Sequence, residues 1–501
     1  MLNDFFVKFS RKFKVYLLDI IFVFASTLVI FIATLSPFNF HFYNSFNITN
    51  FWVSFNNSSS FQDQLNNVLL FMPFGFCGAN LLQKLRIKLG LQVIILLLIS
   101  SGLSFTVESL QVFLPSRSPT PADIVNNTLG GCLGLLSFYI WNYQFLNNSV
   151  SQFKSRSSKL SNQHITLFIL SYVSLTLIIS IFWQSTTNLS NWNLNFPLLL
   201  GNEAVGNRPW RGYISNIYIT DQAISTYEAR AALSNDNYFS SLGSTLVANY
   251  QLNGSCCYQD QAGNLPKLIW QGKPQIINKG QGVFISSNQW LKTGVSVKQL
   301  SQRISEKSEF TISTTLATDN IQQTGPARII SISGDVLQRN LTISQHKSSL
   351  ELRLRTPLTG ENGADLQIKI PGVFTDTKFH QIIITYARGT FQIYIDNLER
   401  FYSLNLLALI PFYQKLFYYA ITFIPLGTGL AILNLFTQNR VRFSRIFIPI
   451  GILLPSTFLE MILMKESNKS LSWTSLFMGI FFTAVTMLIF MIRGRYLNSR
   501  S

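Results

Sequence analysis

Eight runs of mostly apolar residues, each close to the length of a membrane span, divide this chain of 501 residues. A helix needs about 20 such residues to cross a hydrocarbon core about 30 Å thick. Open strands cannot cross, because their unpaired backbone groups would stay unhydrated in lipid. We therefore predict an α-helical membrane bundle of about eight transmembrane helices. The runs cover residues 15–36, 66–82, 90–110, 123–143, 165–184, 415–437, 446–464 and 472–492.

The region between the fifth and sixth runs has a different pattern. Over residues 188–404 apolar and polar residues alternate in short stretches, such as 310–314, 350–355 and 392–395, with Gly, Asn and Pro between them. Alternation with a period of two and frequent turn residues are typical of antiparallel strands. We predict that this region is an all-β jelly-roll sandwich.

Charge and loop position together predict the orientation in the membrane. The net charge is +17, yet residues 188–404 contain 19 Lys and Arg against 15 Asp and Glu, so most of the excess flanks the apolar runs. Short cytoplasmic loops are rich in Lys and Arg. We predict a multi-pass protein of the bacterial plasma membrane with both termini cytoplasmic and the β-domain extracytoplasmic. Sixteen basic residues lie on the predicted cytoplasmic side: Lys8, Arg11, Lys12, Lys14, Lys84, Arg86, Lys88, Lys154, Arg156, Lys159, Arg440, Arg442, Arg445, Arg493, Arg495 and Arg500.

The same distribution argues against nucleic acid as a partner. A nucleic-acid-binding protein gathers its basic residues on one face or along one helix of a recognisable motif. Here the basic residues are spread over short loops beside apolar runs, and no such motif occurs in the sequence. The lipid bilayer is the first partner that the composition predicts.

Polar residues interrupt the ends of the second, third and fourth apolar runs. Glu108 and Gln111 are three residues apart, and Asp123 and Asn127 are four apart, so each pair shares one helix face. Ionisable groups at that depth usually point into a helix bundle or a wet cavity. We predict one outward-facing polar pocket at the outer membrane boundary. Its residues are Asn67, Glu108, Gln111, Arg117, Asp123 and Asn127.

Structural roles remain open for several of these residues. Thr120 and Asp123 match a capping box with a proline at the first helical position, so Asp123 could simply cap the fourth helix. Asn67 and Asn127 could form interhelical hydrogen bonds, and Arg117 could neutralise Glu108. Small residues and a proline in the same helices predict close helix packing. These are Pro73, Gly75, Gly130, Gly131 and Gly134.

Three motif blocks occur in this membrane part: N-x-L-L-F-x-P-x-G-F from residue 67, E-x-x-Q-x-F-x-P-x-R from residue 108, and D-I-x-x-N-T-L-G-G-x-x-G from residue 123. In this order and spacing they resemble the VanZ-like family, over about residues 15–145. The family is named for a protein associated with resistance to teicoplanin, a glycopeptide that acts at the outer cell surface. The resemblance thus implies a cell-envelope protein. The motif positions are Asn67, Pro73, Gly75, Glu108, Gln111, Arg117, Asp123, Asn127, Gly130 and Gly131.

A fainter echo occurs near the C-terminus, where residues 454–460 end another apolar run with Glu460. The following loop and helix lie at a similar distance, although no N-T-L-G-G block follows. This pattern indicates a degenerate repeat of the VanZ-like helix pair, or alternatively an isolated Glu460 that is paired within the bundle. We predict four segments: 1–145 for the VanZ-like unit, 146–187 for a cytoplasmic loop and the fifth helix, 188–404 for the sandwich, and 405–501 for three C-terminal transmembrane helices.

The β-rich region has its own resemblance. Residues 308–313, 380–386 and 389–397 resemble the laminin G-like, or concanavalin A-like lectin, family, whose usual final strands have their counterpart here at 200–219, before the domain. We predict one circularly permuted sandwich, and two truncated copies are the alternative. The resemblance implies binding of envelope glycan or an extracytoplasmic protein, and calcium is possible. Glycosidases need two carboxylates at a set separation, and no such strand occurs, so no catalytic residue is assigned.

The other candidate chemistry is sparse. Cys77 and Cys132 lie in apolar helices, and the adjacent Cys256 and Cys257 are either free or linked as a strained disulfide. No cofactor motif occurs. The leading hypothesis is a VanZ-like envelope protein with an outer glycan- or protein-binding domain, linked to glycopeptide resistance or envelope maintenance. A membrane enzyme acting on a lipid-linked glycan at the polar pocket, and a purely structural anchor for adhesion, are the alternatives.

Overall fold

The computed structural model describes two compact units. One comprises Met1–Ile165 with Ile489–Ser501, and the other comprises Thr166–Leu488. The described residues are 2–41, 61–114, 119–142, 148, 162–235, 237–253, 258–273, 282–335, 337–437, 441–467 and 470–498. Arg117, Cys256, Cys257 and the basic loop at 154–159 lie outside them.

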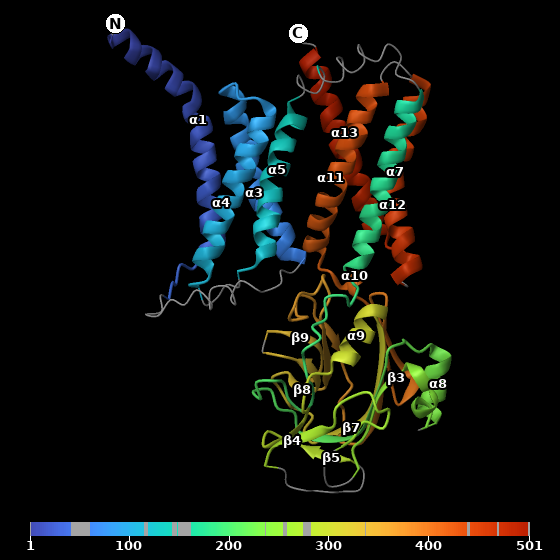
Figure 1. Ribbon diagram of the computed structural model, residues 1–501. Coiled ribbons are helices and arrows are strands. Elements are labelled where there is room, and N and C mark those ends of the chain that lie inside the picture. The colour runs from blue at the N-terminus through green and yellow to red at the C-terminus, as the bar shows by residue number, and fades with distance from the viewer. Residues whose placement is uncertain are drawn as a thin grey trace. The chain divides into compact units, whose positions relative to one another are not determined.

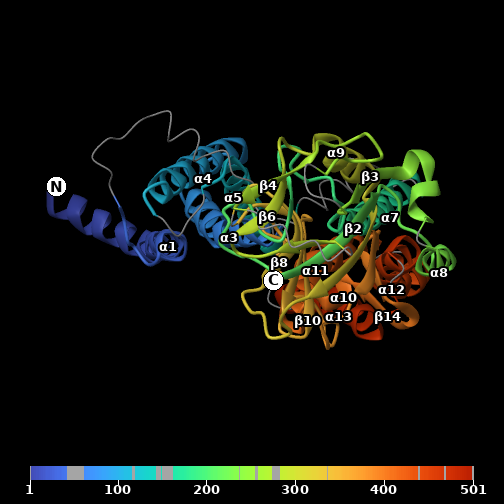
Figure 2. The same ribbon diagram turned by 90° about the horizontal axis from the view of Figure 1, so that it is seen from below.

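The first unit is built from four long helices. They are α1 (Leu2–Leu35), α3 (Phe61–Lys84), α4 (Leu89–Gln111) and α5 (Pro121–Trp141). Figures 1 and 2 both show α3, α4 and α5 side by side. Their buried apolar side chains, among them Phe71, Leu96 and Phe138, form one core cluster.

The second unit contains most of the other four long helices together with all the strands of the described residues. The helices are α7 (Asn162–Ser185), α11 (Phe412–Thr437), α12 (Val441–Ser467) and α13 (Trp473–Asn498). Together with the first unit, the described residues contain eight helices that are long and apolar enough to cross a membrane. This number confirms the predicted helical membrane part.

Two antiparallel sheets make up the β-region, which confirms the predicted sandwich (Figure 1). One sheet has the strand order β11-β10-β9-β8-β1-β6-β4, and the other has the order β14-β13-β12-β7-β2-β3, with β5 paired to β2. The strands are β1 (Leu198–Leu200), β2 (Gly212–Thr220), β3 (Leu246–Gln251), β4 (Leu268–Gly272), β5 (Val283–Ile285), β6 (Gln289–Thr293), β7 (Glu309–Thr318), β8 (Ala327–Ser333), β9 (Arg339–His346), β10 (Ser349–Leu354), β11 (Ile368–Ile370), β12 (His380–Ala387), β13 (Thr390–Ile395) and β14 (Asn397–Asn405).

The alternation read from the sequence places one side of each strand in the core. Ile330 and Ile343 pair across β8 and β9, Ile312 and Ile384 pair across β7 and β12, and all four are buried. Apolar side chains on the facing surfaces of two sheets form such a core because successive residues point to opposite faces. Among the described residues, short α-helices also lie outside the sheets: α8 (Thr226–Ser234), α9 (Lys298–Lys307) and α10 (Leu406–Leu409).

The segment before the domain supplies interior strands to both sheets. β1 lies between β8 and β6, and β2 lies between β7 and β3. Residues 198–220 are therefore required to complete each sheet, and residues 198–405 form one sandwich. The relation of this strand order to a circular permutation stays a prediction.

Two helices extend further than the apolar runs predicted. α1 begins at Leu2 rather than residue 15, and α3 begins at Phe61 rather than residue 66. The added turns carry polar and charged residues. A helix continues through them because its backbone hydrogen bonds do not require apolar side chains.

Candidate functional site

Glu108 is the central residue of the polar cluster in the first unit. It lies in the last turn of α4 and is 2% exposed. Its Oε2 accepts a hydrogen bond of 3.1 Å from the backbone N–H of Thr120, the residue that precedes α5. A carboxylate held by a backbone donor is a strong, directional contact. The contact joins the end of α4 to the start of α5.

Thr120 also begins α5 as its N-cap. Its side-chain oxygen accepts from the backbone N–H of Asp123 at 3.2 Å, and Pro121 follows in the first turn. N-cap threonines satisfy a backbone donor that the helix leaves unpaired. The capping alternative thus has a geometric basis: Asp123 supplies the capped N–H, and its buried carboxyl group lies in the first turn.

One turn further along α5, Asn127 is almost fully buried. Its Nδ2 donates to Ser104 Oγ of α4 at 2.9 Å, so this contact is interhelical. Its Oδ1 is buried without a hydrogen-bond partner among the described residues, as is Ser100 Oγ. Unpaired buried acceptors are costly and uncommon. This region of the α4–α5 interface is therefore polar, and its buried oxygen atoms are incompletely hydrogen-bonded by the described residues.

The other predicted pocket residues have different surroundings. Gln111 is buried and donates through Nε2 to the backbone carbonyl of Thr34 in α1 at 3.1 Å. Asn67 is half-buried on α3. Arg117 lies outside the described residues, so its pairing with Glu108 stays a prediction. The structure thus links Glu108 and Asp123 through Thr120, and Gln111 to the first helix.

The small residues of α3 and α5 lie where the two helices approach most closely. A methyl group on Gly75 would run into the carbonyl oxygen of Gly131. Methyl groups on Gly130 and Gly134 would run into the carbonyl oxygens of Val68 and Met72. Close backbone approach of this kind is what small residues permit in membrane helices. Pro73 lies inside α3, between these contacts.

A second polar network in this unit was missed by the sequence reasoning. The carboxylate of Asp19 in α1 accepts from Asn80 Nδ2 at 2.8 Å and from Lys84 Nζ at 2.7 Å and 2.9 Å. Next to Lys84 on α3, the side-chain oxygen of Gln83 lies 2.9 Å from Tyr139 Oη, which also lies 2.9 Å from the side-chain oxygen of Gln92. The sequence signal that could have predicted this network was Asp19, the lone carboxylate inside the first apolar run.

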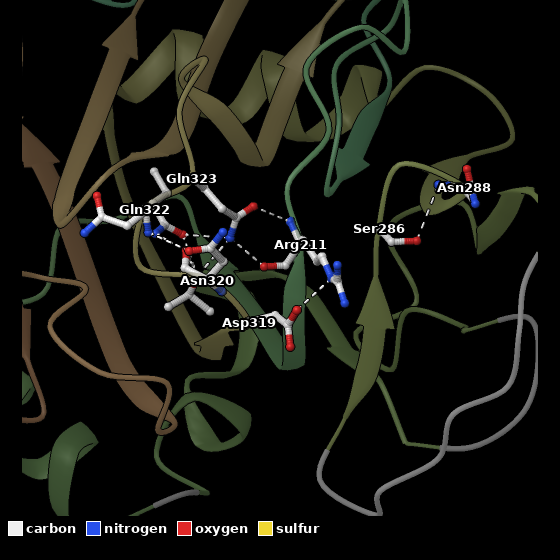
Figure 3. A network of polar contacts seen from close by, with 9 residues as sticks. Arg211, Ser286, Asn288, Asp319, Asn320, Gln322 and Gln323 are labelled. Carbon is white, nitrogen blue, oxygen red and sulfur yellow. Dashed lines mark hydrogen bonds and ion pairs between the residues drawn. The ribbon is translucent and has the colours of Figure 1, made fainter.

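A polar network on the sandwich joins two loops that are far apart in sequence (Figure 3). Gln323 binds the backbone of Arg211 in both directions: its Oε1 accepts from the N–H at 2.7 Å, and its Nε2 donates to the carbonyl at 2.6 Å. The Arg211 guanidinium forms an ion pair of 2.6 Å with Asp319. These contacts fix the start of β2 against the loop after β7.

Aromatic rings adjoin this network. The Arg211 guanidinium lies 5.8 Å from the centre of the Phe284 ring. Tyr213 lies 4.9 Å from Phe284 and 6.3 Å from Phe379, measured between ring centres, and the three rings are half-buried. We call Tyr213, Phe284 and Phe379 the aromatic strip. It offers apolar ring faces next to a cation and a carboxylate.

Two polar clefts open elsewhere on the second unit. One, of about 470 Å³, is lined mainly by residues 222–226, Glu228, Thr385, Thr390 and Gln392. The other, of about 570 Å³, is lined by Asn249, Gln261, Asn264 and Arg303 among others. Both linings are rich in amide and hydroxyl groups, which can donate and accept hydrogen bonds.

Buried charges lie on the sheet that contains β8 and β9. The Glu203 carboxylate is 3.4 Å from Arg328 Nε and 3.8 Å from Arg339 Nη2, and all three residues are buried. Burial and the neighbouring Arg339 charge lower the pKa of Arg328 to about 10, and burial with the Arg353 charge lowers that of Arg339 to about 10. The guanidinium groups therefore stay charged at neutral pH.

Metal-ligating residues do not gather in the described part of the chain. Within it, no group of three or more His, Cys, Asp or Glu side chains is arranged to hold a metal ion. A calcium ion in the sandwich stays a prediction. The two predicted states of Cys256 and Cys257 stay predictions, because both cysteines lie outside the described residues.

Eight apolar helices and a separate β-sandwich define a multi-pass membrane protein with one large non-membrane domain. Residues 15–142, which contain α4, α5 and the Glu108 contact, match the family model described as VanZ/LLP1. This part of the chain is therefore a VanZ/LLP1 domain. No curated protein and no solved structure matches the chain. The laminin G-like resemblance of the sandwich stays a prediction.

Proposed function

We propose that this protein acts in the bacterial cell envelope and receives an amphiphilic envelope component at the Glu108 cluster. The observation that carries the proposal is a buried carboxylate at the end of a membrane span, next to incompletely satisfied polar groups. A carboxylate at that depth is costly unless a partner or a wet cavity compensates it. Recognition of a polar headgroup by such a cluster, with its apolar tail in lipid, would provide that compensation.

The orientation predicted from the basic loops supports an outer location. Glu108 and Thr120 lie at the α4–α5 connection, on the side opposite the short Lys- and Arg-rich loops. A ligand at this position would come from the outer leaflet or the cell wall. The VanZ/LLP1 match supports the same compartment, since the family is named for resistance to a glycopeptide that acts outside the cell.

The sandwich is the proposed binding domain for envelope glycan. Sugar rings stack their apolar faces on aromatic side chains, while their hydroxyl groups bind amides and charged groups. The aromatic strip with Arg211 and Asp319 combines both features. The amide-rich clefts offer further hydrogen-bonding groups. An extracytoplasmic protein is the other possible partner of this domain.

Substitution of the carboxylates tests the membrane site. Cells whose only copy carries Glu108→Gln together with Asp123→Asn should become as susceptible to teicoplanin as cells that lack the gene. Both changes keep the size of the side chains and remove their charge. Glu399→Gln, at an exposed position of β14, is the control for loss of a carboxylate elsewhere and should leave susceptibility unchanged. Normal resistance in the double variant, at normal protein levels, would refute a role for the cluster.

Co-sedimentation tests the outer domain. The full-length protein in detergent should pellet with isolated cell-wall sacculi. Phe284→Ala should weaken this binding by about tenfold, the change that corresponds to the loss of one contact worth about 1.4 kcal/mol. Tyr227→Ala, at an exposed tyrosine on α8, is the aromatic control. Loss of binding on calcium removal would identify a metal site. A protein that stays in solution with sacculi would contradict the glycan proposal and favour a protein partner.

A further inference from the structure

The two membrane parts of the chain carry the same motif in the same register. A Phe-x-Pro-x-Gly segment lies in α3 at residues 71–75 and in α11 at residues 423–427, which is 352 positions later. The buried glutamates Glu108 and Glu460 have the same separation. The register thus passes from α3 to α4, and from α11 to α12, without an insertion or deletion.

Burial follows the same register. Side chains that are buried in the first set of helices have buried counterparts 352 positions later, and several of them are the same residue type. The pairs are Phe71 and Phe423, Phe74 and Leu426, Ala79 and Ala431, Ser104 and Ser456, Val107 and Leu459, Gln111 and Leu463, and Leu135 and Met487.

The contacts of the two carboxylates also correspond. Thr120 N–H donates to Glu108 Oε2 at 3.1 Å, and Ser472 N–H donates to Glu460 Oε2 at 3.3 Å. The side chain of Thr120 accepts from the N–H three residues on, and so does that of Ser472, at 3.3 Å from Ser475 N. In both parts a glutamate in one helix therefore binds the N-cap of the next helix.

Helix packing agrees with this correspondence. Gly75 of α3 lies against the backbone of Gly131 in α5, and Gly427 of α11 lies against the backbone of Thr483 in α13. The four residues occupy equivalent positions in the 352-residue register. In each membrane part the proline-containing helix and the helix that follows the glutamate approach each other at the same point.

The two parts differ at the residue that faces the second carboxylate. Tyr419, at the position equivalent to Asn67, donates from Oη to Glu460 Oε1 at 3.1 Å and is 2% exposed. Its ring stacks on Phe423 with 5.5 Å between ring centres. Both oxygens of Glu460 thus accept a hydrogen bond from the chain itself, one from a backbone N–H and one from a phenol.

In the first unit that hydroxyl is missing. Asn67 is shorter than tyrosine and half-buried. Among the described residues Glu108 receives its hydrogen bond on Oε2, from Thr120, and none of them donates to Oε1. No described residue therefore places a hydroxyl donor at Glu108 Oε1, as Tyr419 does at Glu460 Oε1.

We infer that α11, α12 and α13 are a second copy of α3, α4 and α5, with α7 in the role of α1 and the sandwich inserted between α7 and α11. In this second copy Tyr419 occupies the site, whereas the Glu108 site takes a ligand whose hydroxyl group donates to Glu108 Oε1 as Tyr419 does to Glu460. The inference rests on the proposed function and specifies the ligand chemistry: a hydroxyl group on an otherwise apolar molecule.

The probe is 4-fluorophenol, which reproduces the tyrosine side chain, and 4-fluoroanisole is the control because it cannot donate. Fluorine NMR on the full-length protein in detergent should show saturable binding of the phenol, about tenfold or more tighter than that of the anisole. This factor corresponds to one hydrogen bond, since about 1.4 kcal/mol is a tenfold change in affinity. The substitution Asn67→Tyr should abolish phenol binding, because the new side chain fills the site as Tyr419 does.

Opening the second site gives the reciprocal experiment. The substitution Tyr419→Asn should add a second saturable phenol site, so that the variant has two. Adding Asn67→Tyr to the same chain should reduce the number of sites to one. Equal binding of phenol and anisole by the wild type, or phenol binding that survives Asn67→Tyr, would overturn the proposed ligand chemistry. Absence of a second site in a folded Tyr419→Asn variant would overturn the equivalence of the two units.

The two proposals fail separately. Normal teicoplanin resistance in the Glu108 and Asp123 variant would refute the role of the Glu108 cluster in the proposed function, whatever the phenol result. A missing phenol site, with resistance still dependent on Glu108, would refute the hydroxyl ligand alone. Addition of octyl glucoside distinguishes a sugar-bearing ligand from a phenolic one. The glucoside should displace 4-fluorophenol if the sugar hydroxyl groups reach the Glu108 carboxylate.

Discussion

Thr120 serves two helices at once, because its backbone N–H binds Glu108 of α4 and its side chain caps α5. The substitution Thr120→Ala keeps the first contact and removes the second. It should lower the free energy of unfolding in detergent by about 0.5–2 kcal/mol, the usual value of an N-cap. Thr128→Ala is the matched control, since that hydroxyl binds the Ile124 carbonyl within its own helix. Equal losses in both variants would contradict the capping role.

Single residues differ in how far the sequence can predict their role. Glu108, Asp123 and Asn127 were predictable as a cluster, because polar residues at helical spacing stand out in apolar runs. The partner group that completes each contact was not predictable, since the Thr120 N–H and the Ser104 hydroxyl carry no pattern of their own. Gln323 was missed for a similar reason: its partner Arg211 is brought near only by the sheet.

At the scale of elements, the close approach of α3 and α5 depends on glycine. The substitution Gly75→Ala would push a methyl group into the Gly131 backbone, which cannot move without shifting α5. We expect a loss of about 1–3 kcal/mol in the free energy of unfolding, as for other overpacked positions. Gly102→Ala in α4 meets no neighbouring atom and should be neutral or stabilising by up to about 1 kcal/mol. Thermal unfolding of the two variants in one detergent compares them directly.

An equally small loss for Gly75→Ala and Gly102→Ala would show that the helices do not pack as described.

The existence and type of the helices were predictable from the sequence, because length and hydropathy suffice for a membrane span. The pairing of strands was not: β1 has three residues and binds both β8 and β6, and nothing in those three leucines specifies either partner. Partner choice in a sheet depends on the whole set of strands.

For the whole molecule, the duplication and the inserted sandwich give one consistent arrangement. The sequence carried the signal in the Phe-x-Pro-x-Gly motif and in Glu460, yet most positions between them differ. Only the matching contacts of Glu108 and Glu460 distinguish a repeat from an isolated buried glutamate. An inserted domain also explains why α7 and α11 are separated by more than 200 residues while α1 and α3 are not.

Buried tyrosines predict how the sandwich responds to alkali. Burial raises the pKa of Tyr386, whose hydroxyl donates to the Thr187 carbonyl at 2.5 Å. Burial and the Asp260 charge raise the pKa of Tyr250, whose hydroxyl donates to the Pro266 carbonyl at 2.6 Å. Unfolded tyrosine loses its proton near pH 10. Above that pH the folded state holds protons that the unfolded state releases, so stability is intact below about pH 10 and falls as the pH rises further.

Each of these tyrosines should lower the free energy of unfolding by about 1.4 kcal/mol for every pH unit above 10. Denaturant unfolding of the full-length protein, followed at pH values on both sides of 10, measures this slope, and tyrosinate absorbance should appear together with unfolding. The substitution Tyr386→Phe should reduce the slope by one such increment, while removal of its hydrogen bond costs about 1 kcal/mol at neutral pH. Tyrosinate absorbance that rises fully in the folded protein, with no loss of stability, would contradict the burial of these two hydroxyl groups, and with it the close contact between the sandwich residue Tyr386 and the segment that follows α7.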